Sequence, residues 1–344
     1  MIVSRELTRK KGKNMSPNKT TKQWPLTSAI VISDETNLSL IIRTLIKTLD
    51  WNLEYTTASP SFAIEQLQNN TAKCLIVIDS PTLPAAETLR NLQKNGTARL
   101  TPTIVLAPEN LQQDLQIYEK IFRVNFATKP LTPNNFISAF TTMLRTWEKP
   151  AMSGLRKLTP LIADDKMKFK LEILRKLRGD LLALPLALQA EVAILVSTGH
   201  QTAAELILLD AFKSFPNSLN VMAQLAWFYL NAKMPDQAIL YLKKLKSIAA
   251  KSTIFNLDLA AAYIAKSELS TAIPYMIDWK NTHVGNEIID AQIARILVAE
   301  GKIGLADALG VPKGIVKKTA DIWDQFDHRH DTAPKDQETG PRAS

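Results

Sequence analysis

The sequence predicts a parallel α/β sheet of five strands followed by an all-α array of helical hairpins. Between residues 28 and 147, short apolar runs alternate with amphipathic stretches, which is typical of parallel strands joined by helices. Beyond Pro150 this alternation stops, and long amphipathic stretches begin in which alanine recurs at a fixed interval. The length of 344 residues, with 46% hydrophobic and 22% charged residues, is typical of two folded units.

The composition excludes several classes of protein. No apolar run approaches the roughly 18 residues that are needed to cross a bilayer. Cys74 is the only cysteine, so no internal disulfide can form, and we expect a buried strand thiol. The first 24 residues contain no apolar stretch like that of a secretory signal, so we expect a cytoplasmic protein.

The net charge of +9 is concentrated in two segments. Residues 1–24 hold seven basic residues against the single acid Glu6, and we expect them to form a disordered tail, whether translation starts at Met1 or Met15. The other basic segment is 156–178. Basic tails bind nucleic acids by releasing counterions. A solvated arm is the commoner role, so specific nucleic-acid binding by residues 1–24 is kept only as a second alternative function.

Five strands are expected in the first half, each a short run with β-branched or aromatic residues. Ser59-Pro60 and Thr132-Pro133 each place a capping hydroxyl before a proline, and so mark the starts of two intervening helices. Ligands of such open sheets bind beyond the carboxyl ends of the strands. The expected strands are Ala29–Ile32, Leu53–Thr56, Leu75–Ile78, Thr103–Leu106 and Asn125–Thr128; the residues beyond their ends include Asp34, Asp79, Ala107 and Lys129.

Three short segments lie at the ends of the first, third and fifth expected strands: 31–35 (VISDE), 75–79 (LIVID) and 128–130 (TKP). They are similar to the signature segments of response-regulator receiver domains, so residues 26–148 resemble that family. The resemblance implies that Asp79 accepts a phosphoryl group from a histidine kinase, that Asp34 and Asp79 bind Mg²⁺, and that Lys129 senses the phosphate. It also implies that Phe126 is the switch aromatic. Mg²⁺ would neutralise the phosphoryl oxygens, and the lysine would hold the new charge.

Two residues depart from the receiver pattern. Ser33 replaces the first acid of the Mg²⁺ pair, and Ala107 replaces the hydroxyl that would contact the phosphoryl group. Fewer carboxylates weaken a site for a hard cation, and without the hydroxyl the phosphate loses a contact that would move the switch. The resemblance therefore leaves two alternatives, a pseudo-receiver that serves as a docking module and an active receiver phosphorylated on Asp79. In the first alternative, Asp34, Asp79 and Lys129 form only an ion pair and a helix cap, and bind neither metal nor phosphate.

In the second half of the chain, alanines recur at a spacing of 34 residues, and the neighbouring large residues Leu225 and Leu259 keep the same spacing. With this spacing, residues 185–316 resemble tetratricopeptide repeats, which are stacked helical hairpins. Such repeats bind peptides or helices in a groove lined by the first helix of each hairpin. The alanines are Ala204, Ala238, Ala272 and Ala306 in one series, and Ala226, Ala260 and Ala294 in another.

Projecting the repeat onto the chain predicts which residues line the partner-binding groove. These are Asn220, Trp227, Asn231 and Arg295, with Trp227 as the anchor. Packing of Trp227 against the preceding hairpin or a capping segment is the alternative.

Residues 151–184 are expected to form a linker and an amphipathic basic helix over Asp165–Leu182, whose leucines cover the open first repeat. The polar stretch with His328, His330 and Asp331 has no packed pattern, and we expect residues 317–344 to be largely disordered.

These observations predict a non-enzymatic signalling adaptor of the phosphorelay type. In this hypothesis the degenerate receiver regulates or docks, and the repeats bind a partner protein. An enzyme is not expected, because the sequence has no phosphate-binding glycine loop, no paired metal histidines and no nucleophile motif.

Overall fold

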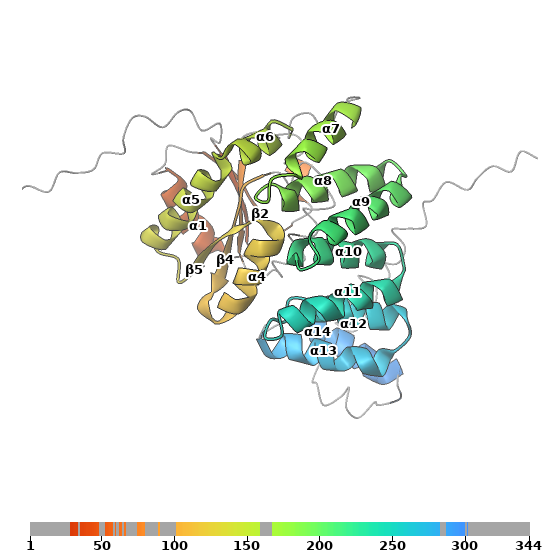
Figure 1. Cartoon of the computed structure of the whole chain (residues 1–344). Coiled ribbons are helices and arrows are strands. Elements are labelled where there is room, and N and C mark those ends of the chain that lie inside the picture. The colour runs from red at the N-terminus through yellow and green to blue at the C-terminus, as the bar shows by residue number, and fades with distance from the viewer. Residues whose placement is uncertain are drawn as a thin grey trace, which may run out of the picture.

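The computed structural model contains a sheet domain followed by a helical array (Figure 1). The predicted tails at residues 1–24 and 317–344 lie outside the described residues, as do Asp34 and Ala306. The structure describes residues 28–33, 35–47, 52–57, 59, 62–63, 65–66, 74–79, 89, 101–158, 167–282, 287–299 and 301.

The sheet consists of five parallel strands in the order β2-β1-β3-β4-β5. In the register of its centre, Ala29 pairs with Leu75, and Val77 pairs with Ile104. All five predicted strands are confirmed within two residues at each end. They are β1 (Ser28–Ile32), β2 (Asn52–Thr57), β3 (Cys74–Asp79), β4 (Thr103–Pro108) and β5 (Asn125–Lys129).

Helices cover both faces of the sheet, which explains the apolar strands. Val31 and Ile104 pack in one hydrophobic cluster with α1 and α5, whereas Ile30 and Val105 pack in another with α4. These helices are α1 (Thr36–Lys47), α4 (Gln112–Phe122), which follows the short 3-10 turn η2 (Glu109–Leu111), and α5 (Pro133–Trp147).

Both predicted capping hydroxyls accept backbone hydrogen bonds. Thr132 forms a capping box with Asn135 at the start of α5, with Pro133 at the first helical position. Ser59 Oγ accepts a hydrogen bond from the backbone of Phe62 at 3.3 Å. Local sequence therefore determines where these turns begin.

The segment after the sheet domain forms α6 (Pro150–Leu158) and α7 (Met167–Leu177). Leu171 and Leu174 are buried in the cluster that includes α8, so α7 covers the first hairpin as expected. The helix is shorter than predicted, and Leu181 lies beyond its end and is 66% exposed. Asp180 favours a turn here, because its carboxylate accepts hydrogen bonds from the backbone of Leu182 and Ala183, just before α8 begins at Leu184.

The rest of the array is built from antiparallel helices whose boundaries repeat every 34 residues. The first helices end at residues 197, 231, 265 and 299, and the second helices begin at residues 201, 235 and 269. The predicted ladder residues Ala204, Ala238 and Ala272 are fully buried. The first helices are α8 (Leu184–Ser197), α10 (Leu219–Asn231), α12 (Asn256–Ala265) and α14 (Glu287–Ala299); the second helices are α9 (Gln201–Ser214), α11 (Pro235–Ile248) and α13 (Leu269–Thr282).

The turn after each first helix has the same conformation. Gly199, Lys233, Ser267 and Gly301 have φ values of 79°, 56°, 61° and 74°, all in the left-handed region. Only two of these four positions carry glycine, the residue that adopts this region without steric cost.

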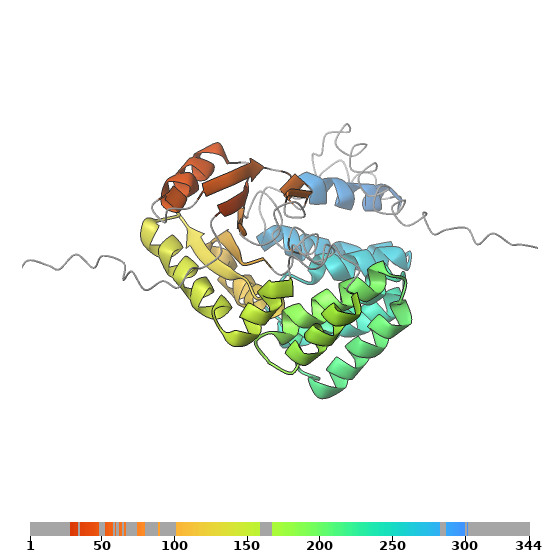
Figure 2. The same cartoon turned by 90° about the horizontal axis from the view of Figure 1, so that it is seen from above.

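Both hydrophobic clusters contain residues of the sheet domain and of the array. One runs from the sheet through α4 into α8, α10, α12 and α13. The other runs from the opposite face of the sheet through α5, α6 and α7 into α8. Figures 1 and 2 show the hairpins following one another from green to blue beside the sheet domain. Helix α4 contacts both α8 and α10, so it is one of the elements through which the two parts meet.

Candidate functional site

The carboxyl ends of β1, β3 and β5 bring four polar side chains together. Asp79, at the end of β3, is fully buried and accepts a hydrogen bond from Ser33 Oγ at 2.9 Å. Lys129 Nζ lies 2.5 Å from the other oxygen of Asp79 and 3.4 Å from a carboxylate oxygen of Glu35. Ser33 Oγ in turn accepts a hydrogen bond from the backbone of Glu35. We call Ser33, Glu35, Asp79 and Lys129 the strand-end cluster.

Burial dominates the electrostatics of this cluster. It raises the pKa of Asp79, because a carboxylate loses its hydration in the protein interior. The Lys129 ammonium and the Ser33 hydroxyl act in the opposite direction, and Glu35 adds a further upward effect. The ion pair with Lys129 therefore compensates only part of the cost of burying the charge of Asp79.

The structure brings two of the four predicted receiver residues into contact. Asp79 and Lys129 form an ion pair, whereas Asp34 lies outside the described residues. The ring of Phe126 is half-buried, with its centroid 6.5 Å from that of Tyr118 in α4. Ala107 is buried in the sheet core. The functional roles inferred for these residues stay predictions.

The described part of the cluster fits Mg²⁺ poorly while Lys129 is in place. Mg²⁺ prefers carboxylate oxygens, but Ser33 and Lys129 already engage both oxygens of Asp79. Among the described residues, no three His, Cys, Asp or Glu side chains come together in a way that could hold a metal ion. Mg²⁺ binding through Asp34 and Asp79 stays a prediction.

Sequence reasoning named the segment that contains Glu35 but not its contact with Lys129. Glu35 precedes α1, and its partner at the end of β5 is 94 residues away in the chain. The only local signal is its position directly after β1, at the edge where the strand ends meet.

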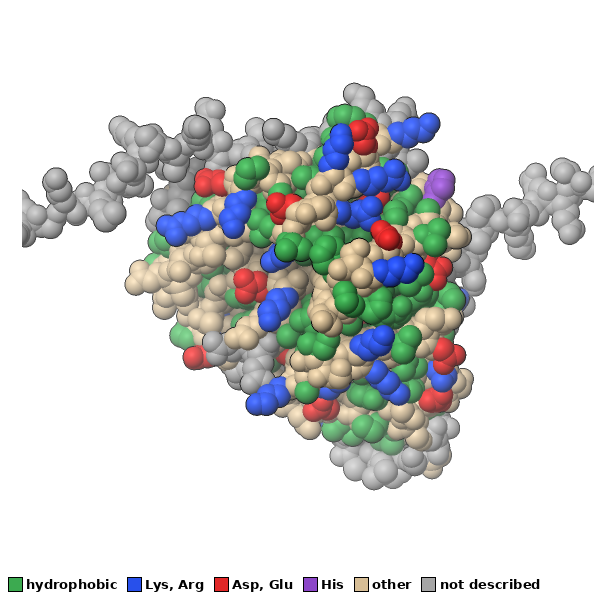
Figure 3. Space-filling model, viewed as in Figure 1, with side chains coloured by type: hydrophobic (Ala, Val, Ile, Leu, Met, Phe, Trp, Pro, Cys, Tyr) green, Lys and Arg blue, Asp and Glu red, His purple; other side chains and the backbone are tan. Residues whose placement is uncertain are grey.

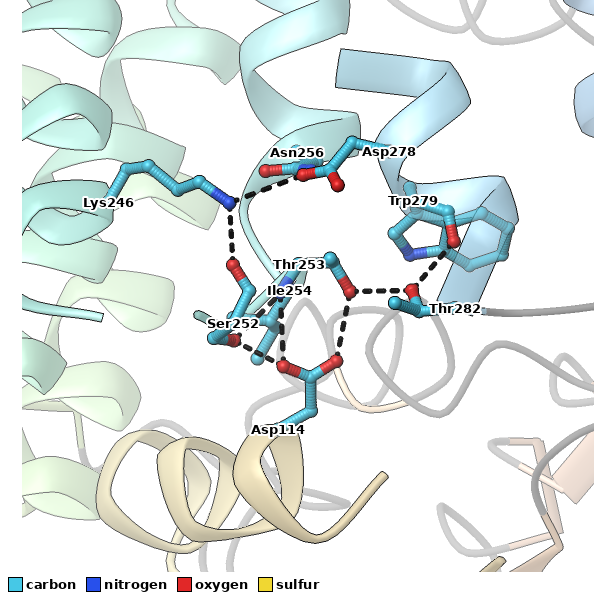
Figure 4. Close-up of polar contacts among 9 residues, drawn as sticks. All are labelled: Asp114, Lys246, Ser252, Thr253, Ile254, Asn256, Asp278, Trp279 and Thr282. Carbon is cyan, nitrogen blue, oxygen red and sulfur yellow. Dashed lines mark hydrogen bonds and ion pairs between the residues drawn. The ribbon is translucent and has the colours of Figure 1, made fainter. Parts of the chain in front are cut away.

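A second group of polar contacts joins the amino-terminal end of α4 to the array (Figure 4). Asp114, in the first turn of α4, is 5% exposed. It accepts hydrogen bonds from Ser252 Oγ, from the Thr253 backbone at 3.1 Å and from Thr253 Oγ1 at 3.0 Å. Both hydroxyl residues lie in the segment between α11 and α12. The carboxylate is therefore held by donors from a different part of the chain.

The carboxyl-terminal end of α4 is held by α10. Asn220 Nδ2 donates a hydrogen bond to the backbone carbonyl of Ile121. The rings of Phe122 and Trp227 stack with their centroids 5.4 Å apart, and Trp227 Nε1 donates to Asp258 at 3.0 Å. We call Asn220, Trp227, Ser252 and Thr253 the α4-binding surface.

Asn220 and Trp227 are both covered in this structure, and their role in partner binding stays a prediction. Asn220 is 2% exposed and Trp227 is 9% exposed, because α4 of the same chain lies on them. Asn231 is exposed and Arg295 is half-buried, and their role in partner binding stays a prediction. The sequence analysis expected helices between the strands but not the contact of α4 with the repeats, and it did not identify Asp114, Ser252 or Thr253.

The second helices present a different surface. Figure 3 shows hydrophobic side chains between lysines on the face that carries α9 and α11. Leu206 in α9 is 62% exposed, and Leu240, 34 residues later in α11, is 53% exposed. Within the described residues, none of the helices is long and apolar enough to span a membrane.

Comparisons with known proteins give little guidance. No family model matches the chain, and no curated protein matches it. One similar solved structure is MamA, from residue 41 to its end, from Desulfovibrio magneticus RS-1; it shares 15% identity at a TM-score of 0.39 and covers 52% of this chain and 97% of its own. A MamA RS-1 double mutant gives 15% identity and a TM-score of 0.40, and covers 51% of this chain and 96% of its own. Similarity at this level carries no argument about function.

Proposed function

We propose that this protein is a non-enzymatic signalling adaptor. Its hairpins bind a partner protein, and its sheet domain is a degenerate receiver that regulates or docks. The observation that carries the proposal is the contact between α4 and the α4-binding surface. The first helices of the array hold a helix from another part of the chain through both polar and aromatic contacts. Helical repeats use this side of the array to bind protein segments.

The sheet domain supports the regulatory part of the proposal. The strand order 2-1-3-4-5 is that of flavodoxin-like doubly wound sheets, whose ligands bind at the carboxyl ends of the strands. Asp79 and Lys129 meet at this edge. Helix α4, which follows one of the central strands, extends from the same domain to the hairpins. A structural change at the strand ends can therefore reach the α4-binding surface through a single helix, α4.

Photo-crosslinking at two positions tests the adaptor proposal. Asn231 is exposed and lies one helical turn after Trp227, so it borders the α4-binding surface. Lys213 is exposed near the end of α9, a second helix. A photoreactive residue at position 231, introduced in the source cells, is expected to form a discrete protein adduct that position 213 does not form. Equal labelling at both positions would contradict binding on the side of the first helices.

An active receiver is the second candidate, and the Asp79–Lys129 ion pair favours it. A phosphorylated Asp79 would need Lys129 to move from the carboxylate to the phosphoryl oxygens, which is a small displacement for a side chain already 2.5 Å away. Incubation with Mg²⁺ and a small phosphodonor, followed by mass spectrometry of wild type and Asp79→Asn, tests this candidate. A labile adduct found only in wild type supports an active receiver. The absence of an adduct in both proteins supports the docking module.

A further inference from the structure

The α4-binding surface contacts α4 at two places that are far apart along the helix. Near the amino-terminal end of α4, Asp114 accepts three hydrogen bonds from Ser252 and Thr253. Near the carboxyl-terminal end, Phe122 stacks on Trp227. The two α4 residues are eight positions apart, close to two helical turns, so they lie toward the same side of the helix.

The segment that holds Asp114 departs from the repeat. Ser218 caps α10, since its hydroxyl accepts a hydrogen bond from the backbone of Val221. Ser252 occupies the equivalent position 34 residues later, where a regular repeat would begin the helix at residue 253. However, α12 begins only at Asn256. The third hairpin has thus lost the first turn of its first helix.

The missing turn leaves three donors directed at one carboxylate. The Ser252 hydroxyl donates to Asp114 instead of capping its own helix in the way of Ser218, and the Thr253 backbone and hydroxyl donate as well. Lys246 supports the segment from the other side, because its Nζ donates to the Ser252 carbonyl at 2.8 Å while it forms an ion pair with Asp278 at 3.5 Å (Figure 4). The Thr253 hydroxyl also contacts the Thr282 hydroxyl at 3.0 Å. A neutral apolar side chain in place of the carboxylate would take away the acceptor of the buried Ser252 hydroxyl and of the Thr253 backbone N–H, which is costly. The donors of Ser252 and Thr253 therefore favour an anionic side chain at this position.

We infer that the α4-binding surface is a receptor for a helix that carries a carboxylate in its first turn and an aromatic ring eight residues later. A partner protein presents such a helix and takes the place of α4. This inference rests on the proposed adaptor function and names the class of partner that the surface accepts. Helix α4 is the internal ligand that a partner must displace.

Because α4 occupies the α4-binding surface, it lowers the apparent affinity of the surface for a partner helix. A tethered ligand acts at an effective concentration that can reach the millimolar range. The apparent dissociation constant of an external helix is its intrinsic value divided by the fraction of molecules in which the surface is free. Weakening the internal contact at α4 is therefore expected to strengthen binding of an external helix, although no residue of the receptor has changed. A purely structural contact would not give this effect.

The test uses the full chain and a fluorescent peptide with the sequence of residues 109–124, followed by anisotropy. In the chain variant Asp114→Ala, the internal helix loses its carboxylate while Ser252 and Thr253 stay in place. We expect the peptide to bind this variant at least tenfold more tightly than it binds wild type. A peptide that itself carries Asp114→Ala is expected to bind the variant chain no more tightly than it binds wild type. A peptide with Glu119→Ala, which removes an exposed carboxylate, is expected to bind the variant chain as tightly as the native peptide does.

The repeat supplies a matched pair of receptor variants. In the Asp114→Ala background, Ser252→Ala removes a donor to the carboxylate and is expected to weaken peptide binding at least fivefold. Ser218→Ala removes the equivalent serine of α10, which does not contact Asp114, and is expected to leave peptide binding unchanged. Circular dichroism and tryptophan emission verify that each variant is folded. If Asp114→Ala unfolds at the assay temperature, Asp114→Asn replaces it in the same series.

The inference is overturned if the peptide binds wild type and the Asp114 variants equally, or if the Asp114→Ala peptide binds as well as the native peptide. It is also overturned if no peptide binds a folded Asp114 variant. An adduct at position 231 together with no peptide binding would show that the hairpins recruit a protein through another kind of segment. Peptide binding without any adduct at position 231 would instead count against the adaptor function and leave the receptor site intact.

Discussion

Asp79 and Asp114 are both buried carboxylates of the sheet domain, but their partners come from different parts of the chain. Asp79 is paired with Lys129 inside the sheet domain. Asp114 accepts hydrogen bonds from neutral groups of the array. The pKa of Asp79 is raised, because burial outweighs the ion pair. The first carboxylate is thus a local feature of one domain, whereas the second is a contact between two.

This difference indicates where regulation can act. A change in the charge at Asp79 alters a cluster that is complete within the sheet domain. A change at Asp114 or at the aromatic pair Phe122 and Trp227 alters contacts between the sheet domain and the array. Coupling between the two regions requires an element that touches both, and α4 is one such element, since it packs on the sheet core and contacts α8 and α10.

The largest effect is expected from Trp227→Ala. This change removes the stack on Phe122 and the hydrogen bond to Asp258, and it should lower the free energy of unfolding by about 3–5 kcal/mol. Hydrogen exchange of the α4 amides should become faster. Phe212→Ala is the control, because its ring contacts Tyr241 within the array. Slow α4 exchange in Trp227→Ala would mean that the remaining contacts of α4, such as those of Asp114 and Ile121, are enough to hold it on the array.

Lys129→Met is expected to have the next largest effect and to act only on the local carboxylate. It leaves Asp79 buried without its counter-charge, which should cost about 3 kcal/mol at pH 8. The cost should be smaller at pH 5, because without the lysine the pKa of Asp79 rises further and the group takes up a proton. Urea unfolding at both pH values measures this difference. Lys120→Met, which removes an exposed lysine of α4, should show no such pH dependence.

Lys233→Gly tests whether a change that stabilises the array also stabilises the sheet domain against unfolding. Lys233 has a φ of 56° in a turn where the equivalent residue of the first hairpin is Gly199. Glycine should raise the free energy of unfolding by about 1 kcal/mol. If the shared core makes the two parts unfold together, the transition of the sheet domain should shift with that of the array. Separate transitions, of which only one moves, would mean that the contacts of α4 do not couple them.

Sequence patterns predicted the local parts of this architecture well. The five strands, the Thr132 capping box and the 34-residue ladder depend on short-range chemistry or on a repeat, and both are visible in a single sequence. The ion pair of Asp79 with Lys129 follows from the order of parallel strands, whose carboxyl ends share one edge.

The contact of α4 with the array could not be predicted in the same way. Asp114 and Thr253 are 139 residues apart, and nothing near either residue indicates the other. One signal was present in the composition of the first helices. Helix α10 contains no charged residue and α8 contains only Glu191, and a helix without a polar face is covered on all sides. This pattern indicates that something lies on these helices, but not that it is α4.

The smallest effect is expected from Asp79→Asn, and its sign follows from the raised pKa of Asp79. The folded protein binds the Asp79 proton more tightly than the unfolded chain does, so this group favours folding at low pH. That contribution is lost as the pH rises from about 4 through the raised pKa of the folded protein. Asparagine has no such charge, so the melting temperature of the variant relative to wild type should increase as the pH rises above about 4. Thermal unfolding between pH 4 and pH 8 measures this trend. The opposite trend would mean that Lys129 compensates the buried charge fully, and Asp79 would then resemble Asp114 in being fully satisfied by its partners.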